Sequence, residues 1–202
     1  AKKEIQFDLI SSYAMFYDVD SPNLFCKDIY KLLKNNGVWI LELSYFPLML
    51  KNLTFDQICH EHLMYYTFSV FEKILINNKL KVIDIKMNEI NGGSLEVIVA
   101  KRKSKRISNT KLIKRIKKDE KKITFKAYQN FSKRIKRVKE DLVSFVDKNY
   151  PIIGYGASTK GNIVLNYCKL SSQKINYVCD ANTQKFGKYT PGSNIGIISK
   201  AK

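Results

Sequence analysis

An almost continuous apolar run, Val38-Trp39-Ile40-Leu41-Glu42-Leu43, constrains the fold more than any other feature of the chain. Such a run is typical of a strand buried on both faces, as in a parallel sheet covered by helices. A helix is predicted before it, because Ser21-Pro22 is a usual start and Asn35-Asn36-Gly37 a usual stop. Residues 7–11 predict a further short buried strand. This alternation of strands and helices predicts an α/β fold.

The remaining residues predict a hairpin, one long helix and a second α/β unit. A helix capped by Ser69 is expected through about residue 77, and the turn Asn91-Gly92-Gly93 is expected to join antiparallel strands at residues 82–87 and 94–100. Residues 101–109 predict a polar linker. Residues 110–148 predict a single helix, because apolar side chains recur every three or four residues at Tyr128, Phe131, Ile135, Val138, Leu142 and Phe145. Strands at residues 151–153 and 175–179, with a glycine-rich turn and a helix between them, follow.

Positive charge is concentrated in one segment. Residues 101–140 hold 18 Lys or Arg against 3 Asp or Glu, in a chain whose net charge is +18. A basic segment can bind nucleic acid or an acidic membrane surface. However, residues 101–122 contain no aromatic side chain on which a base could stack. We therefore interpret the segment as a solvated helix face and expect no nucleic-acid partner.

The cysteines and the hydropathy pattern indicate a cytoplasmic protein without a membrane partner. Cys26, Cys59, Cys168 and Cys179 show no CxxC spacing, so a closed zinc site is not expected. Scattered cysteines in a chain without an export signal usually stay reduced. No apolar run reaches the ~18 residues that a membrane-spanning helix needs, and the N-terminus does not resemble a signal peptide.

The two histidines of the chain flank one glutamate in His60-Glu61-His62. Histidine is the side chain whose ordinary pKa lies nearest neutrality, so this tripeptide is a candidate for proton transfer. A metal site fits the spacing poorly, because helical zinc sites use positions i and i+4. Two unrelated histidines are the alternative. The nearby aromatic residues favour a functional site; they are Tyr65, Tyr66 and Phe68.

A second candidate is the turn GYGASTKGN at residues 154–162. Glycines let the backbone approach a ligand, and a helix start presents N–H groups to a phosphate. The candidate binding residues are Gly154, Tyr155, Gly156, Ala157, Ser158, Lys160 and Asn162. The glycine spacing differs from the GxGxxG pattern of dinucleotide sites. A tight turn without a ligand is an equal alternative.

Two weaker candidates lie in the first hundred residues. Asn91, Gly92, Gly93 and Ser94 predict either a simple hairpin turn or a loop that faces a substrate. Glu42 lies near the end of the predicted parallel strand, where α/β sheets place their ligands. A solvated strand end is the alternative for Glu42.

Together and in this order, these motifs resemble the S-adenosylmethionine-dependent C-methyltransferases that act on nucleotide-linked sugars. The resemblance is carried by residues 8–10, 16–22, 37–42, 44–45, 55–58, 60–63, 92–95, 154–157 and 160–162, and by Asp180, Lys185, Gly187, Pro191 and Gly192. It implies that residues 1–102 are the C-terminal half of a Rossmann-like methyltransferase domain. Residues 103–149 would be a linker and long helix, and residues 150–202 a truncated α/β substrate-binding domain. The chain, which lacks an initiator Met, is expected to be a fragment without activity of its own.

The resemblance also implies a reaction and roles. Such enzymes methylate the carbon next to the ketone of a nucleotide-linked keto-deoxysugar, with a cofactor-binding loop that here would lie largely outside the chain. His62 would be the base, Glu61 would orient it or handle a second proton, and His60 would be a supporting or substrate contact. Cys59 stands where many relatives have an aromatic hydroxyl, and Tyr17-Asp18 stands where some have a histidine. The turn at residues 154–162 would hold the phosphates of the substrate.

Two other functions are weighed against this one. In the first, a nicotinamide-dependent sugar-nucleotide oxidoreductase, the turn at residues 154–161 would bind the dinucleotide and Asp180 would contact its ribose. In the second, residues 101–140 would form a nucleic-acid-binding module with strongly salt-dependent affinity. The sequence predicts no oligomeric state.

Overall fold

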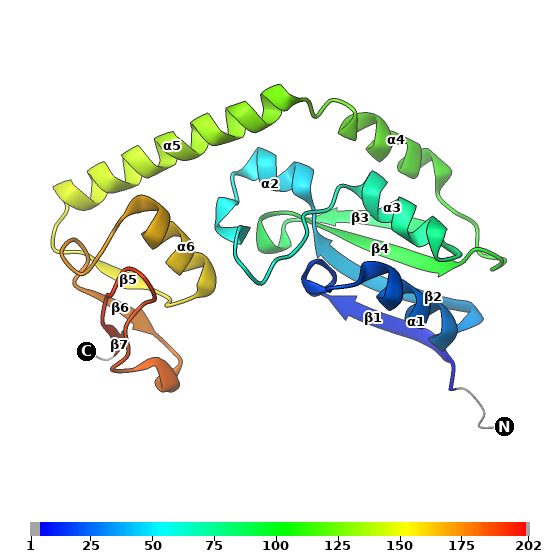
Figure 1. The fold of residues 1–202 in the computed structure, drawn as a ribbon, viewed down its shortest axis with the longest axis horizontal. Coiled ribbons are helices and arrows are strands. Elements are labelled where there is room, and N and C mark those ends of the chain that lie inside the picture. The colour runs from blue at the N-terminus through cyan, green and yellow to red at the C-terminus, as the bar shows by residue number, and fades with distance from the viewer. Residues whose placement is uncertain (1–4, 201–202) are drawn as a thin grey trace. The chain divides into compact units, whose positions relative to one another are not determined.

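The computed structural model describes residues 5–200, which form two compact units (Figure 1). Unit 1 comprises residues 5–54 and 61–128, and unit 2 comprises residues 55–60 and 129–200. Each unit combines a sheet with helices, which confirms the predicted α/β class. The units are defined by packing alone, so the roles predicted for residues 1–102, 103–149 and 150–202 stay predictions.

Unit 1 is built on a four-stranded sheet of order β1-β2-β4-β3. Strand β1 (Phe7–Tyr13) runs parallel to β2 (Leu33–Ser44), whereas β4 (Ser94–Lys101) runs antiparallel to both β2 and β3 (Leu80–Asn88). Helices α1 (Pro22–Leu32) and α3 (Phe68–Asn77) pack side by side against this sheet (Figure 1). The parallel edge and the antiparallel hairpin therefore share one layer.

Aromatic side chains form the centre of the unit 1 core. Phe16, in the 3-10 helix η1 (Phe16–Asp18), is fully buried. Its ring centroid lies 5.2 to 5.9 Å from those of four other rings, which belong to Phe25, Trp39, Tyr66 and Phe71. These distances are typical of favourable aromatic pairs. The core thus fixes the short segment that follows β1.

Three details of unit 1 differ from the sequence-based predictions. Strand β1 is an exposed edge strand, with Leu9 57% exposed, because its second long edge has no partner among the described residues. Asn35-Asn36-Gly37 does not stop α1 but lies inside β2, where the β1–β2 register shifts. Gly37 permits this, since a Cβ there would approach the Phe7 carbonyl oxygen to 2.8 Å. Thr67, and not Ser69, is the N-cap of α3.

The predicted hairpin is confirmed. Strands β3 and β4 pair from Leu80 with Lys101 to Asn88 with Ser94. The turn contains the 3-10 helix η3 (Ile90–Gly92), and its residues Asn91, Gly92 and Gly93 have φ angles of +54°, +82° and +127°. Glycine adopts such angles without the steric cost that other residues bear. The turn lies near helix α2 (Phe46–Asn52), which follows β2.

The single helix predicted for residues 110–148 is wrong. Two helices, α4 (Thr110–Glu120) and α5 (Phe125–Lys148), are separated by residues 121–124. Turn hydrogen bonds close the end of α4, from the Lys122 N–H to the Asp119 carbonyl and from the Ile123 N–H to the Glu120 carbonyl. The predicted apolar seam of α5 holds only in part, because Ile135 is buried whereas Phe145 is 59% exposed.

Unit 2 has a parallel three-stranded sheet of order β5-β6-β7. Its strands are β5 (Ile153–Tyr155), β6 (Tyr177–Asp180) and β7 (Ile197–Ser199), and helix α6 (Thr159–Cys168) links the first two. Residues 55–60 include the 3-10 helix η2 (Phe55–Gln57), and a further one, η4 (Thr183–Lys185), follows β6. Buried core residues are Val146, Ala157, Cys168, Leu170, Ile175, Val178, Ile195 and Ile197.

Candidate active site

The segment after β1 places two of the predicted site residues. Phe16 anchors η1 in the aromatic core, so the next residue, Tyr17, is held with only 6% of its surface exposed. The Ala14 N–H also donates to the Glu42 carbonyl at 3.1 Å, which ties this segment to β2. Asp18 follows at the exposed end of η1. The carboxyl end of a parallel strand therefore positions Tyr17 and Asp18, as α/β sheets commonly do for ligand-facing residues.

His62 lies against Tyr17. The two ring centroids are 4.5 Å apart with an angle of 60° between the ring planes. The Met64 N–H donates to the Tyr17 carbonyl at 3.1 Å, which fixes the backbone two residues after His62. His62 is half-buried. The imidazole thus has a defined aromatic neighbour while part of its surface remains open to a ligand.

Two carboxylates lie in the electrostatic environment of His62. Partial burial raises the pKa of Asp18 above its ordinary value; His62 opposes this shift and Glu61 adds to it. Charges influence one another in this way only at short range in a screened medium. The structure therefore brings Tyr17, Asp18, Glu61 and His62 together in unit 1. A histidine near two carboxylates is suited to taking up and passing on a proton.

Cys59 and His60 belong to unit 2, unlike Glu61 and His62. The Ile58 N–H donates to the Phe55 carbonyl and the Cys59 N–H to the Gln57 carbonyl, so this segment has local turn structure. Phe55 packs its ring 5.2 Å from that of Tyr167 on α6. Cys59 is half-buried and His60 is exposed. The tripeptide that the sequence presents as one motif is thus divided between the two packing units.

The hairpin turn is packed against the segment of α2. A Cβ at Gly92 would come within 2.2 Å of a Thr54 methyl carbon, and one at Gly93 within 2.5 Å of the Leu48 Cβ. The Tyr45 N–H donates to the Gly93 carbonyl at 3.1 Å. Close packing alone accounts for both glycines. A substrate contact by Asn91, Gly92, Gly93 or Ser94 stays a prediction.

Glu42 is a buried carboxylate and not a solvated strand end. Its side chain accepts a hydrogen bond from Asn88 Nδ2 at 3.1 Å, and the residue is 4% exposed. Glu42 lies opposite Tyr13 on β1 and Glu96 on β4. The partner Asn88 was not predicted from the sequence. No local pattern marks it, since it lies 46 residues away from Glu42 in the chain.

The glycine-rich turn of unit 2 uses its first amides within the fold. The Gly156 N–H donates to the Cys179 carbonyl at 2.7 Å, and the Ala157 N–H donates to Asp180 Oδ2 at 2.8 Å. Asp180 also accepts from the Asn182 N–H and from Lys185 Nζ. These hydrogen bonds, led by that of Asn182, lower the pKa of Asp180 to about 2. A carboxylate of the protein therefore occupies one place where the sequence predicts phosphate.

The rest of that turn is a regular helix start. Ser158 caps α6, accepting a hydrogen bond from the Gly161 N–H at 3.1 Å. Gly156 has φ +92° and open space where a Cβ would lie. Asn162 Oδ1 is buried and accepts no hydrogen bond from the described residues. Gly154 and Tyr155 lie on β5, and Lys200 Nζ is 4.9 Å above the Tyr155 ring. Binding by these residues and by Lys160 stays a prediction.

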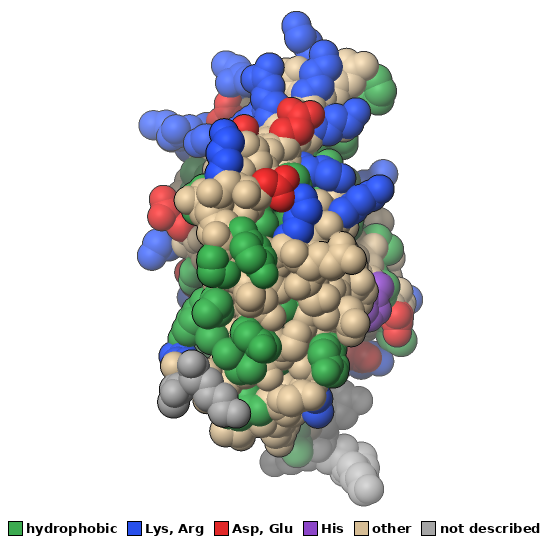
Figure 2. Space-filling model, turned by 90° about the vertical axis from the view of Figure 1, so that its left-hand side faces the viewer, with side chains coloured by type: hydrophobic (Ala, Val, Ile, Leu, Met, Phe, Trp, Pro, Cys, Tyr) green, Lys and Arg blue, Asp and Glu red, His purple; other side chains and the backbone are tan. Residues whose placement is uncertain are grey.

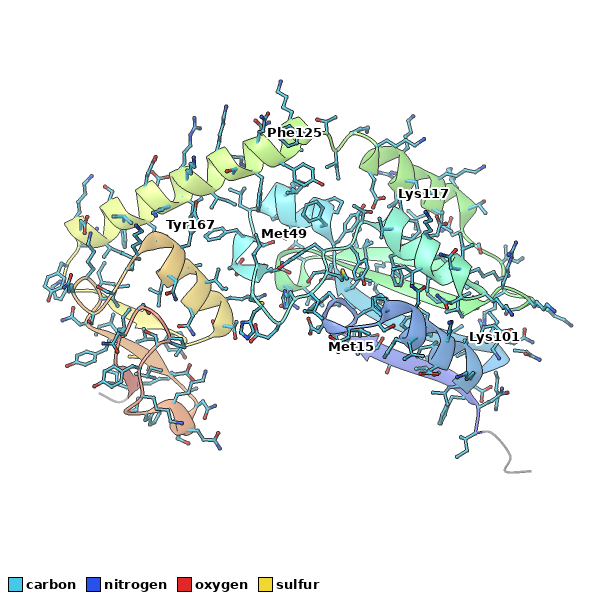
Figure 3. All side chains as sticks on the ribbon, in the orientation of Figure 1. Met15, Met49, Lys101, Lys117, Phe125 and Tyr167 are labelled. Carbon is cyan, nitrogen blue, oxygen red and sulfur yellow. The ribbon has the colours of Figure 1, made fainter. Side chains whose placement is uncertain are left out.

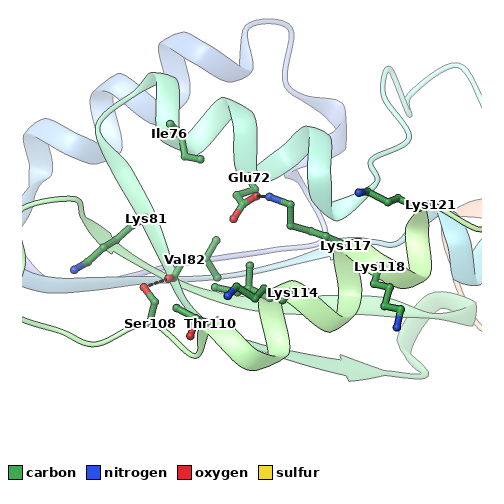
Figure 4. A pocket seen from close by; sticks show the side chains of 11 residues that line it. Glu72, Ile76, Lys81, Val82, Ser108, Thr110, Lys114, Lys117, Lys118 and Lys121 are labelled. Atoms are coloured by element: carbon green, nitrogen blue, oxygen red, sulfur yellow. Dashed lines mark hydrogen bonds and ion pairs between the residues drawn. The ribbon is translucent and has the colours of Figure 1, made fainter.

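A cavity of about 540 Å³ lies away from all of these residues, between α3, α4 and β3 (Figure 4). Its lining includes Ile76, Val82 and Ile113 with a rim of lysines, and Lys117 Nζ forms an ion pair with Glu72 Oε2 at 2.5 Å. None of the predicted site residues lines it. Four of the lining lysines, Lys114, Lys117, Lys118 and Lys121, belong to the basic segment that the sequence singled out, whereas Lys81 lies on β3.

Six further basic side chains of that segment lie along α5: Lys126, Lys133, Arg134, Lys136, Arg137 and Lys139. Figure 2 shows Lys and Arg side chains gathered over this helix, with few acidic ones among them. Within residues 5–200, no helix is long and apolar enough to cross a bilayer. In the same range, no three or more His, Cys, Asp or Glu side chains come together as metal ligands would. The four cysteines, all among the described residues, are not joined in disulfides.

The chain is similar to one curated methyltransferase in particular. It is 29% identical to the C-methyltransferase NovU of Streptomyces niveus over 174 residues. The matched region covers 83% of this chain but only 41% of NovU. The chain therefore spans well under two thirds of that relative's length.

Two solved structures that are named for methyltransferases match part of the chain. A complex of the Trm112 methyltransferase activator with a methyltransferase from Haloferax volcanii matches with a TM-score of 0.41 and 14% identity, over 48% of this chain and 56% of that one. Magnesium protoporphyrin IX methyltransferase (ChlM) from Synechocystis PCC 6803 matches with a TM-score of 0.38 and 11% identity, over 50% of this chain and 47% of that one.

A family model identifies the chain. The model described as the C-methyltransferase C-terminal domain matches residues 89–202. This region includes β4, helices α4 and α5, and the whole sheet of unit 2. It makes up more than half of the chain. The chain therefore belongs to the C-methyltransferase family.

Proposed function

We propose that the protein carrying this chain transfers a methyl group from S-adenosylmethionine to a carbon of a nucleotide-linked keto-deoxysugar. Family membership and the likeness to the C-methyltransferase NovU support methyl transfer to carbon. The nucleotide-sugar substrate rests on the motif resemblance described above. We also propose a reducing, cytoplasmic setting, because scattered cysteines such as these usually remain thiols in a chain without an export signal.

The observation that carries the proposal is the contact of His62 with Tyr17 beside Asp18 and Glu61. A C–H bond next to a ketone is weakly acidic, because the carbonyl takes up the charge left behind. Breaking it at neutral pH calls for a positioned base, and histidine is the usual one. In the proposed reaction His62 takes this proton and the Tyr17 ring holds the imidazole in place. Glu61 either orients His62 or takes up a second proton during the reaction. His60 and Cys59 contact the substrate.

The described residues fit the methyl-accepting half of such a site better than the cofactor half. S-adenosylmethionine would supply an electrophilic methyl group. Within the described part of unit 1, no glycine follows the carboxyl end of either parallel strand, β1 or β2. Glycine-rich turns at such strand ends are the usual cradle of a nucleotide. We therefore assign no residue of this chain to the cofactor.

The glycine-rich turn of unit 2 is the proposed phosphate contact. Its support is the start of α6, where Ser158 and Thr159 are exposed, since helix N-termini attract anions. Asp180 limits the proposal because it already accepts the Ala157 N–H. The same hydrogen bond weakens the nicotinamide alternative, since Asp180 is engaged within unit 2.

The test is product analysis with methyl-labelled S-adenosylmethionine and a panel of nucleotide-linked keto-sugars. We expect label on a sugar carbon next to the ketone, located by mass spectrometry and NMR. His62→Ala is expected to lower turnover about 10²- to 10⁴-fold. The turnover of Glu61→Gln is compared with that of Glu140→Gln, which makes the same change at an exposed carboxylate on α5. Absence of label from any sugar carbon would refute methyl transfer, and normal turnover by His62→Ala would refute the base assignment.

A further inference from the structure

We infer that Glu120, the last residue of α4, is a positioning residue for the segment that carries Glu61 and His62. Its functional meaning rests on the proposed function, but the anchor itself is a property of this chain. Glu120 is 9% exposed, far below what is normal for a glutamate at a helix end. The sequence marks it only as one acidic residue in the basic segment.

The Glu120 carboxylate caps the start of α3 from a different helix. Oε1 accepts the Phe68 N–H at 2.5 Å, and Oε2 accepts the Ser69 N–H at 2.9 Å and also the Ser69 hydroxyl. Thr67 satisfies the next amide, that of Val70. The first N–H groups of a helix have no partner within the helix, and a negative charge there also meets the positive end of the helix dipole.

The same carboxylate holds the end of β2. Tyr45 Oη donates to Glu120 Oε1 at 2.8 Å, and Tyr45 is 4% exposed. Burial, followed by this hydrogen bond, raises the pKa of Tyr45. Tyr45 also bridges to Tyr66, and its N–H donates to the Gly93 carbonyl. One buried group therefore joins α3, β2 and, through Tyr45, the hairpin turn.

These contacts place Glu120 at the end of residues 61–67, the segment that carries Glu61 and His62. Glu61 and His62 are followed within the same unit by Met64, whose N–H donates to the Tyr17 carbonyl. The chain then reaches Phe68 and Ser69, which Glu120 fixes. Residues 61–67 are thus held by Tyr17 near their start, and at their end by Glu120 and by the hydrogen bond from the Phe46 N–H to the Tyr66 carbonyl. We expect that losing the Glu120 contacts loosens the end of this segment and lets His62 move relative to the Tyr17 ring.

The chain offers a matched control for this role. Lys117, one turn earlier on α4, pairs with Glu72 on α3 and points toward that helix (Figures 3 and 4). It joins the same two helices but does not touch the start of α3. Removing Lys117 weakens the docking of α4 and leaves the cap of α3 in place. Comparing the two sites separates the cap from helix docking in general.

The experiment compares Glu120→Ala, Glu120→Gln and Lys117→Ala by amide hydrogen exchange and by NMR of the two histidine rings in the full chain. In Glu120→Ala we expect exchange at the Met64 amide to rise about tenfold or more, as in local opening. The ring signals of His62 should move as the Tyr17 ring withdraws. Amides of β2 and β4 away from Tyr45 and Gly93 should exchange as in the wild type, which a general loss of stability would not allow. Lys117→Ala should leave Met64 and His62 unchanged.

Unchanged Met64 exchange and His62 signals in Glu120→Ala would overturn the inference. So would equal acceleration of all amides, or the same response in Lys117→Ala. If Glu120→Ala unfolds unit 1, Glu120→Gln decides by the same criteria, because it keeps the side-chain volume while removing the charge. These readouts need no turnover, so they stand apart from the proposed reaction. If methyl transfer is found, Glu120→Gln should lower kcat more than it changes KM.

Discussion

Replacing Phe16 with alanine should strongly lower the free energy of unfolding of unit 1, because Phe16 is the centre of its aromatic core. Phe16 is fully buried and contacts four rings at centroid distances of 5.2 to 5.9 Å. Truncating a buried phenylalanine to alanine costs about 3–5 kcal/mol in total, a range that already contains the lost aromatic contacts of about 0.5–1.5 kcal/mol each. We expect a loss of about 4 kcal/mol, from a total that for most domains is about 5–15 kcal/mol.

Urea unfolding followed by tryptophan fluorescence measures this loss in unit 1 alone. Trp39 is the only tryptophan of the chain; it is fully buried in unit 1, 5.9 Å from the Phe16 ring. With an m-value of about 2 kcal/mol per M, the midpoint should fall by about 2 M. Phe125→Ala, at a position 75% exposed (Figure 3), should change stability by less than about 0.5 kcal/mol. A loss below about 1 kcal/mol for Phe16→Ala would refute the packing argument.

Three further predictions concern other parts of the chain. Gly93→Ala should lower the melting temperature of unit 1 by several degrees in calorimetry, since φ is +127° and the new Cβ would lie 2.5 Å from the Leu48 Cβ; an unchanged melting temperature would contradict this. The pKa of Asp180 is lowered to about 2, so its stabilisation of unit 2 is present above about pH 4 and is lost as the pH falls toward 2. Near-ultraviolet circular dichroism should show Asp180→Asn lacking this acid-dependent component, and identical acid profiles would refute the assignment. Burial raises the pKa of Cys26 to about 12, so iodoacetamide at pH 8 should alkylate half-buried Cys59 well before Cys26, as peptide mass mapping would show; equal rates would contradict this.

The elements governed by local signals were predictable. The hairpin follows from two alternating strands around Asn91-Gly92-Gly93, and the structure places positive φ angles at all three turn residues. A helix after the glycine-rich turn at residues 154–162 was also predicted, and Ser158, which was assigned to substrate binding, is its N-cap. Such features depend on residues a few positions apart, which is the range that sequence patterns describe.

Elements governed by distant partners were not predictable. No proline or glycine marks the break between α4 and α5 after Glu120. The Glu120 carboxylate accepts a hydrogen bond from the Phe68 amide, which is 52 residues away in the chain. Burial of β1 was overestimated, because an apolar strand reads the same at the edge of a sheet as at its centre. Asn35-Asn36-Gly37 resembles a helix stop, yet close approach of β1 explains its glycine.

The candidate site shows the same division. The spacing of His60-Glu61-His62 indicated proton transfer, and Tyr17 and Asp18 were added through the family resemblance. Only the structure shows the Tyr17 ring 4.5 Å from that of His62. Glu42 was singled out by its place on β2, but its burial and its partner Asn88 could not be read from the sequence. Nothing local predicted that residues 55–60 would pack with unit 2.

The central claim is that His62 removes a proton from the carbon next to a ketone, and hydrogen exchange into the substrate measures this step most directly. The protein carrying this chain is incubated in D₂O with a nucleotide-linked keto-sugar and S-adenosylhomocysteine, so that no methyl transfer competes. We predict enzyme-dependent deuterium incorporation at that carbon, followed by NMR, and a loss of about 10²- to 10⁴-fold in His62→Ala. Exchange by His62→Ala at the wild-type rate would contradict the account.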